Sequence, residues 1–135
     1  MSKLIVNYKL LEPVGSGQYG KVFKAENIDD KKFYAVKVIQ RDMIESNPKM
    51  KECIINEINT LSKIVNEYVI KFIEMHKTSN NAYLIYEFCD GGTLEKAMFE
   101  NGYFRENEAL RYFKQLVEGL QAIEEHNIIH LDIKP

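Results

Sequence analysis

The spacing of apolar residues changes near residue 91, from a pattern typical of strands to one typical of helices. Before that point, "KVFKAE" (residues 21–26) and "FYAVKVI" (residues 33–39) flank the polar stretch "NIDDKK" and predict a hairpin. After it, apolar residues recur at helical spacing. Strands followed by helices favour an α+β fold, in which "CDGG" (residues 89–92) is the hinge between a sheet-based lobe and a helical lobe.

The same patterns predict further elements on both sides of this hinge. A helix is predicted from Pro48 to Val65, because its apolar residues share one face and proline is tolerated at a helix start. "YVIKFIEMH" (residues 68–76) and "AYLIYEF" (residues 82–88) predict a second strand pair. Beyond the hinge we predict a short helix over 93–99 and a longer one over 106–126. The apolar stripe of the longer helix, which we interpret as core, consists of Leu110, Phe113, Val117, Leu120 and Ile123.

Composition excludes several classes of function. The 135 residues carry a net charge of -2, so no global basic field favours a nucleic-acid partner. No apolar run approaches the ~20 residues that a membrane span needs, so we expect a cytoplasmic protein without a span. Cys53 and Cys89 lack the spacing of a zinc site or a disulfide scaffold, which indicates free thiols in a reducing compartment.

A glycine-rich segment, "GSGQYGKV" (residues 15–22), contains Gly15, Gly17 and Gly20. Glycine lets the backbone approach a phosphate without a side chain in the way. A strand pattern follows, where a dinucleotide-binding fold would need a helix, and no Lys-Ser or Lys-Thr pair marks a Walker-type loop. Taken alone, the segment fits a phosphate-covering hairpin or an ordinary glycine-rich turn.

Two charged residues fall within apolar patterns. Lys37 lies inside an apolar strand, where a lysine is usually solvent-facing, and Glu57 lies on the apolar face of the first predicted helix. An unpaired buried carboxylate costs on the order of several kcal/mol, so we expect Lys37 to pair with Glu57. A lysine that is held in position and kept charged in this way is suited to bind the phosphates of a nucleotide. The alternative is that Glu57 lies at the margin of the stripe and reaches solvent.

Five motifs together occur in the order found in eukaryotic protein kinases. They are the glycine segment, "AVK" (residues 35–37), Glu57, "YEFCDGGTL" (residues 86–94) and "HLDIKP" (residues 130–135). From about residue 8 to its end, the chain therefore resembles a protein kinase catalytic domain.

The resemblance implies a domain organisation. Residues 1–88 would form the kinase-like small lobe, an antiparallel sheet plus one helix. Residues 89–92 would be the hinge, and residues 93–135 the first helices of the large helical lobe, which is incomplete. We therefore interpret the chain as the N-terminal part of a kinase domain that ends inside the catalytic loop.

The resemblance also implies an ATP site. Lys37 would contact the α- and β-phosphates of ATP, with Glu57 as its partner. Val22 and Ala35 would pack against adenine, and Tyr86 falls at the position that gates the pocket behind it. The implied ATP-binding residues are Val14, Gly15, Gly17, Gly20, Val22, Ala35, Lys37, Glu57, Tyr86, Glu87 and Cys89, the last two belonging to the hinge segment whose backbone would bind the base.

Two residues of "HLDIKP" would be catalytic by the same resemblance. Asp132 matches the aspartate that accepts the proton of the substrate hydroxyl, and Lys134 would neutralise the γ-phosphate. His130 is expected to be a packed structural residue. "DIKP" favours Ser/Thr kinases over tyrosine kinases, and the hinge region looks most like autophagy-initiating or calcium/calmodulin-type kinases.

The chain departs from the family pattern at two points. Leu131 stands where most members have an arginine that binds a phosphorylated activation loop. We therefore expect the parent kinase not to depend on this mode of control, unless Leu131 is a neutral packing substitution. The Asn and the Asp-Phe-Gly segment that hold Mg²⁺ in the family would lie beyond Pro135, so we expect ATP and Mg²⁺ as cofactors of the parent but no kinase activity from this chain alone.

Two other functions stay open. The chain could be a non-catalytic kinase-like module that binds another protein, or part of a small-molecule kinase such as an aminoglycoside or choline phosphotransferase. The apolar stripe on the long helix discriminates the module from a kinase fragment, because an exposed apolar patch causes aggregation or demands a partner. A chain that is monomeric and cooperatively folded would favour the module, and a chain that is soluble only when extended would favour the fragment. The close matches to "HLDIKP" and "YEFCDGGTL" disfavour the small-molecule kinases.

Overall fold

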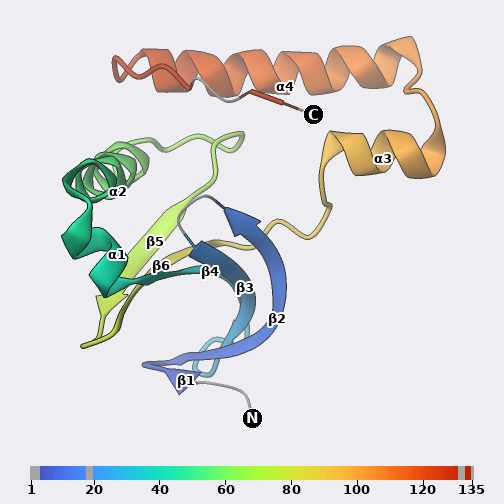
Figure 1. The fold of residues 1–135 in the computed structure, drawn as a ribbon. Coiled ribbons are helices and arrows are strands. Elements are labelled where there is room, and N and C mark those ends of the chain that lie inside the picture. The colour runs from blue at the N-terminus through green and yellow to red at the C-terminus, as the bar shows by residue number, and fades with distance from the viewer. Residues whose placement is uncertain (1–3, 18–19, 131–132, 135) are drawn as a thin grey trace. The chain divides into compact units, whose positions relative to one another are not determined.

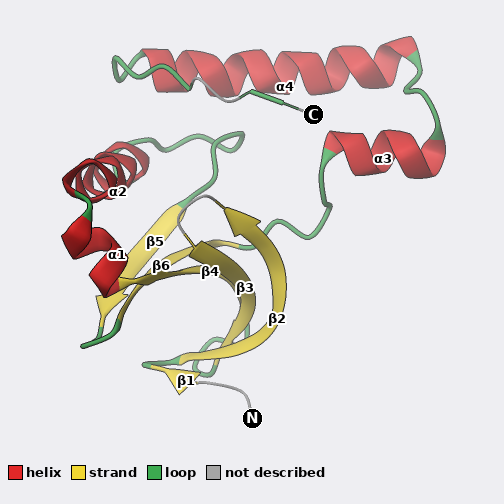
Figure 2. Ribbon diagram, in the orientation of Figure 1, coloured by secondary structure: helices red, strands yellow, loops and turns green. Residues whose placement is uncertain are grey.

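The computed structural model describes residues 4–17, 20–130 and 133–134, which form two compact units. The first unit combines Met1–Ser62 with Lys71–Phe88, and the second combines Lys63–Ile70 with Cys89–Pro135. Figure 2 colours the strands, all of which belong to the first unit, differently from the helices that follow Phe88. The change from strands to helices predicted from apolar spacing is therefore confirmed, while the lobe and hinge boundaries stay a prediction.

An antiparallel sheet of six strands, in the order β1-β2-β3-β4-β6-β5, forms the first unit (Figure 1). Its strands are β1 (Leu4–Ile5), β2 (Tyr8–Gly17), β3 (Gly20–Asn27), β4 (Phe33–Gln40), β5 (Phe72–Lys77) and β6 (Asn81–Glu87). Both predicted hairpins, β3 with β4 and β5 with β6, are present. β5 begins at Phe72, four residues later than predicted, because residues 68–70 belong to the second unit.

The hairpin between β2 and β3 contains the glycine segment and lies close to β4. Gly17 pairs with Gly20, and shifts in register on either side of Pro13 bend β2. A Cβ at Gly20 would clash with the backbone carbonyl oxygen of Val38. Glycine is therefore required at Gly20 by strand packing, independently of any ligand.

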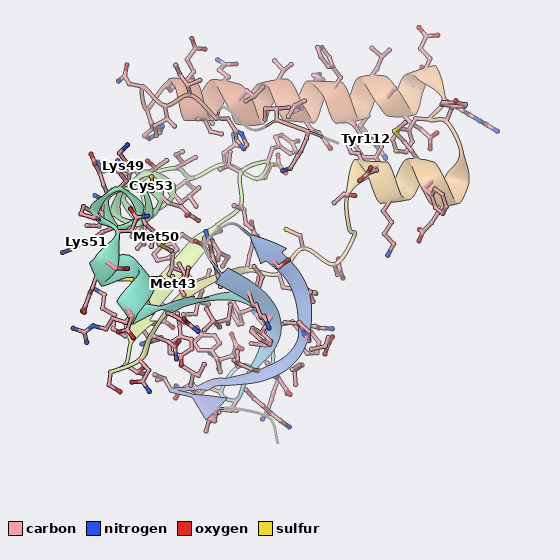
Figure 3. The ribbon with its side chains drawn as sticks, in the orientation of Figure 1. Met43, Lys49, Met50, Lys51, Cys53 and Tyr112 are labelled. Carbon is pink, nitrogen blue, oxygen red and sulfur yellow. The ribbon has the colours of Figure 1, made fainter. Side chains whose placement is uncertain are left out.

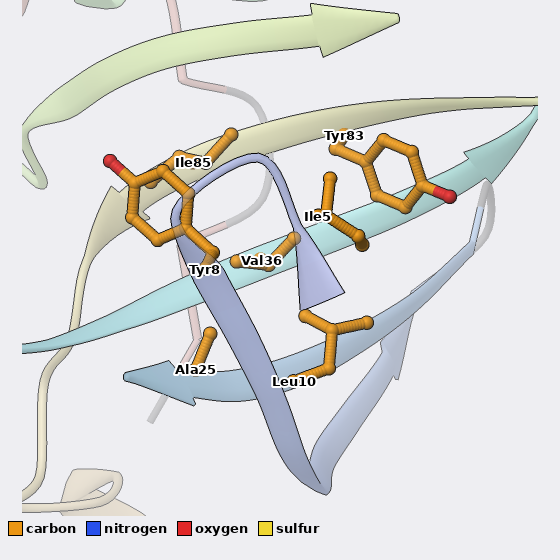
Figure 4. Close-up of a cluster of buried hydrophobic side chains, with 7 residues drawn as sticks. All are labelled: Ile5, Tyr8, Leu10, Ala25, Val36, Tyr83 and Ile85. Carbon is orange, nitrogen blue, oxygen red and sulfur yellow. The ribbon is translucent and has the colours of Figure 1, made fainter. Parts of the chain in front are cut away.

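The two faces of the sheet bury different apolar clusters. Directly paired residues share a face, and side chains alternate between faces along each strand. One cluster, seen in Figure 4, consists of Ile5, Tyr8, Leu10, Ala25, Val36, Tyr83 and Ile85. The other cluster consists of Ile39, Met50, Ile54, Ala82, Leu84 and Tyr86, two of which come from a helix. The sheet is therefore covered on this second face by helix α2.

Helix α2 (Pro48–Leu61) begins as predicted but ends early. The side chain of Asn47 accepts a hydrogen bond from the backbone N–H of Met50, and Pro48 occupies the first turn. Met50 is buried toward the sheet, whereas Lys49 and Lys51 are exposed (Figure 3). The helix ends at Leu61, so the predicted extension to Val65 is wrong. The chain there crosses into the second unit.

A short helix, α1 (Arg41–Ser46), precedes α2 and was not predicted. It has no buried residue, so no apolar stripe marks it in the sequence. Arg41 and Glu45 form an ion pair one turn apart, with 2.6 Å between Nε and Oε1. The described residues of the first unit therefore form two helices, where the sequence predicted one.

The second unit contains helices α3 (Leu94–Asn101) and α4 (Glu106–Glu124), close to the predicted bounds. Thr93 caps α3 by accepting a hydrogen bond from the backbone N–H of Lys96, and Gly102, whose φ is 78°, is the C-cap that follows Asn101. In α4, a Cβ at Gly119 would lie 3.0 Å from the carbonyl oxygen of Tyr68. This glycine therefore permits close packing within the unit.

The apolar stripe of α4 is not core throughout. Leu110, Phe113 and Val117 are 56%, 63% and 44% exposed, while Leu120 and Ile123 are half-buried. The interpretation of the stripe as core is therefore wrong for its first three members. Helical periodicity predicts which residues share a face but does not show that the face is covered. Within the described ranges, no helix combines the length and the apolar character required to cross a membrane.

Candidate functional site

Strand register brings the predicted nucleotide contacts of the sheet onto one face. Gly15 pairs with Val22, and Val22 pairs with Lys37 across the next strand. Ala35 lies two residues before Lys37 on the same face and pairs with Tyr86. This is the face that α2 covers. The glycine hairpin, Lys37 and Tyr86 therefore share the surface of the sheet on which α2 packs.

Lys37 and Glu57 form the predicted ion pair. The Nζ atom of Lys37 lies 3.0 Å from Oε2 and 3.3 Å from Oε1 of Glu57. Ile54 and Ile58 anchor α2 to the sheet on either side of Glu57, which places the carboxylate above β4. Both charged side chains keep partial access to solvent, 18% for Lys37 and 33% for Glu57. The predicted pairing is confirmed, and Glu57 holds the lysine in place.

Tyr86 makes a second contact with Glu57 that was not anticipated from the sequence. Its hydroxyl donates to Oε1 of Glu57 at 2.5 Å, and its ring meets Phe72 edge-on, with the centroids 5.6 Å apart. Burial, and next the hydrogen bond to Glu57, raise the pKa of the Tyr86 hydroxyl. A signal for this contact was present, because a buried tyrosine needs a hydrogen-bond partner and Glu57 was already expected near this face.

The remaining predicted ATP contacts lie on β2, at the end of β6 and directly after Phe88. Val14 is exposed on β2, beside Gly15. Glu87 ends β6, and its Oε1 accepts a hydrogen bond of 2.7 Å from the backbone N–H of Lys71. Cys89 is exposed at the start of the second unit's long segment. The roles of these residues toward a nucleotide stay a prediction.

The predicted catalytic segment belongs to the second unit. Lys134 and His130 are exposed there, so the expectation that His130 is packed is not met. Leu131 and Asp132 lie outside the described residues. In the described part of the chain, no group of three His, Cys, Asp or Glu side chains could hold a metal ion.

The raised pKa of Tyr86 predicts a loss of stability at alkaline pH. The hydroxyl ionises near pH 10 in the unfolded chain but only at higher pH in the folded chain. Its contribution to stability is therefore complete below pH 10 and is lost as the pH rises above that value. In the wild type, the free energy of unfolding measured by urea titration should fall between pH 9 and 12. We expect this fall to be shallower in Tyr86→Phe, by up to about 1.4 kcal/mol per pH unit.

The control for this pH dependence is Tyr103→Phe, because Tyr103 is almost fully exposed. Each variant keeps every other ionisable side chain of the wild type, so the difference from the wild type isolates one hydroxyl. Equal alkaline slopes for the wild type and Tyr86→Phe would contradict the prediction.

Comparison with known proteins agrees with this geometry. Residues 8–135 match the family model described as the protein kinase domain. Over 98% of its length, the chain is 32% identical to serine/threonine-protein kinase ATG1c of Arabidopsis thaliana, of which it covers 18%. It is also 31% identical to serine/threonine-protein kinase greatwall of Xenopus tropicalis, over 97% of the chain and 15% of the relative.

A third relative, the serine/threonine-protein kinase stk11 homolog of Dictyostelium discoideum, is 32% identical over 98% of the chain and 23% of its own length. The chain thus spans less than a quarter of each of these three kinases. The family match covers nearly the whole chain, and the Lys37–Glu57 pair lies where the kinase resemblance requires it. This chain belongs to the protein kinase domain family.

Proposed function

We propose that this chain is the ATP-holding part of a Ser/Thr protein kinase domain, which transfers the γ-phosphoryl group of ATP to a protein hydroxyl. The observation that carries the proposal is the Lys37–Glu57 pair, with 3.0 Å between Nζ and Oε2, beneath a glycine hairpin on the same sheet. The names of the relatives support the Ser/Thr class. Complete activity would need the rest of a kinase domain.

The first unit's role is to hold the nucleotide's phosphates. Lys37 would place its ammonium between the α- and β-phosphates, and Glu57 keeps that ammonium from swinging into solvent. Val22 and Ala35, on the same face, would contact adenine. The backbone of the glycine hairpin would cover the phosphates.

The transfer step would use the segment that includes Asp132 and Lys134. The bond between the γ-phosphorus and the bridging oxygen breaks, a bond from the substrate hydroxyl oxygen to the phosphorus forms, and ADP leaves. Asp132 would take the hydroxyl proton, and Lys134 would neutralise charge on the transferred group. Mg²⁺, when bound, neutralises the phosphates in this family, and its ligands are expected beyond residue 135.

Nucleotide binding tests the proposal directly. We expect Lys37→Met to weaken ADP binding by about 10- to 150-fold, because a hydrogen bond to a charged group contributes about 1.5–3 kcal/mol. Isothermal titration calorimetry on the chain gives the dissociation constant. The control is Lys9→Met, which removes an exposed lysine from β2 of the same sheet. Equal affinities for wild type and Lys37→Met, or absence of ADP binding to wild type, would reject the proposed role.

A second candidate function is the non-catalytic interaction module. The exposed start of the α4 stripe favours it, since Leu110, Phe113 and Val117 present apolar surface. Such a module has no need to bind nucleotide through Lys37. A chain that stays monomeric and cooperatively folded, and whose ADP affinity is unaffected by Lys37→Met, would favour the module over the kinase.

A further inference from the structure

The carboxylate of Glu57 receives hydrogen bonds from two different strands. Lys37 of β4 lies 3.0 Å from Oε2, and the hydroxyl of Tyr86 on β6 lies 2.5 Å from Oε1. The tyrosine contact falls in the 2.5–2.7 Å range typical of a hydroxyl donating to an ionised carboxylate. The two donors thus bind mainly different oxygens, which restrains rotation of the carboxylate about its terminal bond.

The protein holds the Tyr86 hydroxyl firmly in place. Tyr86 is 6% exposed, its backbone pairs with Ala35, and its ring packs edge-on against Phe72. A tyrosine ring fixed in this way loses little conformational entropy when its hydroxyl binds Glu57. The strand therefore presents a rigid donor to the helix.

We infer that Tyr86 is a positioning residue, whose hydroxyl holds the Glu57 carboxylate in the orientation that binds Lys37. The inference rests on the proposed function, because it acts through the residue proposed to hold the phosphates. Lys37 alone could engage either oxygen of a rotating carboxylate. With Oε1 bound to Tyr86, Oε2 is directed to Lys37 and α2 is tied to two strands.

Because Tyr86 acts through Glu57 and Lys37, its hydroxyl should affect the binding of the nucleotide's phosphates and not the binding of adenine. Loss of its hydroxyl leaves the ring in place but frees the carboxylate and, with it, the lysine. Adenosine, which has no phosphates, does not engage Lys37. A purely structural role for the hydroxyl would instead change the affinities for ADP and adenosine together, or change neither.

The test compares ADP and adenosine binding to the chain and to Tyr86→Phe by calorimetry. We expect Tyr86→Phe to weaken ADP binding by about three- to tenfold, the range of one ordinary hydrogen bond, and to leave adenosine binding within about twofold. The matched control is Tyr83→Phe, since Tyr83 is also buried on β6 but faces the opposite side of the sheet. It should change neither affinity. Equal losses for both ligands, or no loss for either, overturn the inference.

A second measurement needs no nucleotide and separates this inference from the proposed function. The coupling between Lys37→Met and Glu57→Gln is determined from urea unfolding, once with Tyr86 and once in the Tyr86→Phe background. We expect the coupling, expressed as a ratio of unfolding constants, to fall at least about threefold without the hydroxyl. An unchanged coupling overturns the inference. If wild type binds no ADP, the proposed function fails, and this coupling alone decides whether Tyr86 orients the pair.

Discussion

Ile54→Ala should lower the free energy of unfolding of the first unit by about 2–5 kcal/mol. Ile54 is 5% exposed and packs in the cluster that joins α2 to the sheet. Truncation to alanine removes buried methyl groups and leaves a cavity that the surrounding side chains fill only in part. Urea unfolding followed by far-ultraviolet circular dichroism measures the loss.

The neighbouring isoleucine is the control for this substitution. Ile55 is on the same helix but is 46% exposed, so Ile55→Ala should change the free energy of unfolding by less than about 0.5 kcal/mol. The same truncation at adjacent positions thus separates burial from helix propensity. Equal effects of the two substitutions would show that α2 is not held to the sheet through Ile54. Because α2 carries Glu57, Ile54→Ala should also weaken ADP binding, while Ile55→Ala should not.

Leu84→Ala should destabilise the first unit by a similar amount, about 2–5 kcal/mol. Leu84 is fully buried in β6, between Lys37 on β4 and Met75 on β5. It lies on the face that α2 covers, so its loss opens the cluster beneath the Lys37–Glu57 pair. The midpoint of urea unfolding should fall with little change in slope.

Leu4→Ala is the matched control for Leu84→Ala. Leu4 lies in the two-residue strand β1 and is 55% exposed. Its truncation should therefore cost less than about 0.5 kcal/mol. A comparable loss at both leucines would contradict the burial of Leu84 in the cluster that α2 covers.

Strand and helix patterns in the sequence predicted most elements of the fold. The hairpin of β3 and β4, the start of α2 at Pro48 and both later helices follow from alternation, proline placement and helical period. These signals are local, because each depends on a few neighbouring residues. The two misses have separate causes: α1 has no fully buried residue, and α2 stops where the chain leaves the first unit.

The Lys37–Glu57 pair could also be predicted, since a carboxylate on an apolar helix face needs a cation and a strand lysine was available. The contact of Tyr86 with Glu57 depends on the register between β4 and β6 and on where α2 crosses the sheet. Neither is encoded in the spacing of residues along the chain. A sequence motif therefore indicates which groups a site contains, whereas strand register decides which atoms of those groups meet.

The order of five motifs was thus sufficient for the resemblance to the family. Local sequence was sufficient for the α+β architecture and for the ion pair, because periodicity, turn residues and unpaired charge act over short stretches or through simple complementarity. Packing in three dimensions was needed to show that Gly20 makes room for the Val38 carbonyl and that the first half of the α4 stripe is exposed. It also revealed that the Tyr86 hydroxyl binds Glu57. Each of these depends on which distant segments come into contact, and burial is a property of the folded chain rather than of any segment within it.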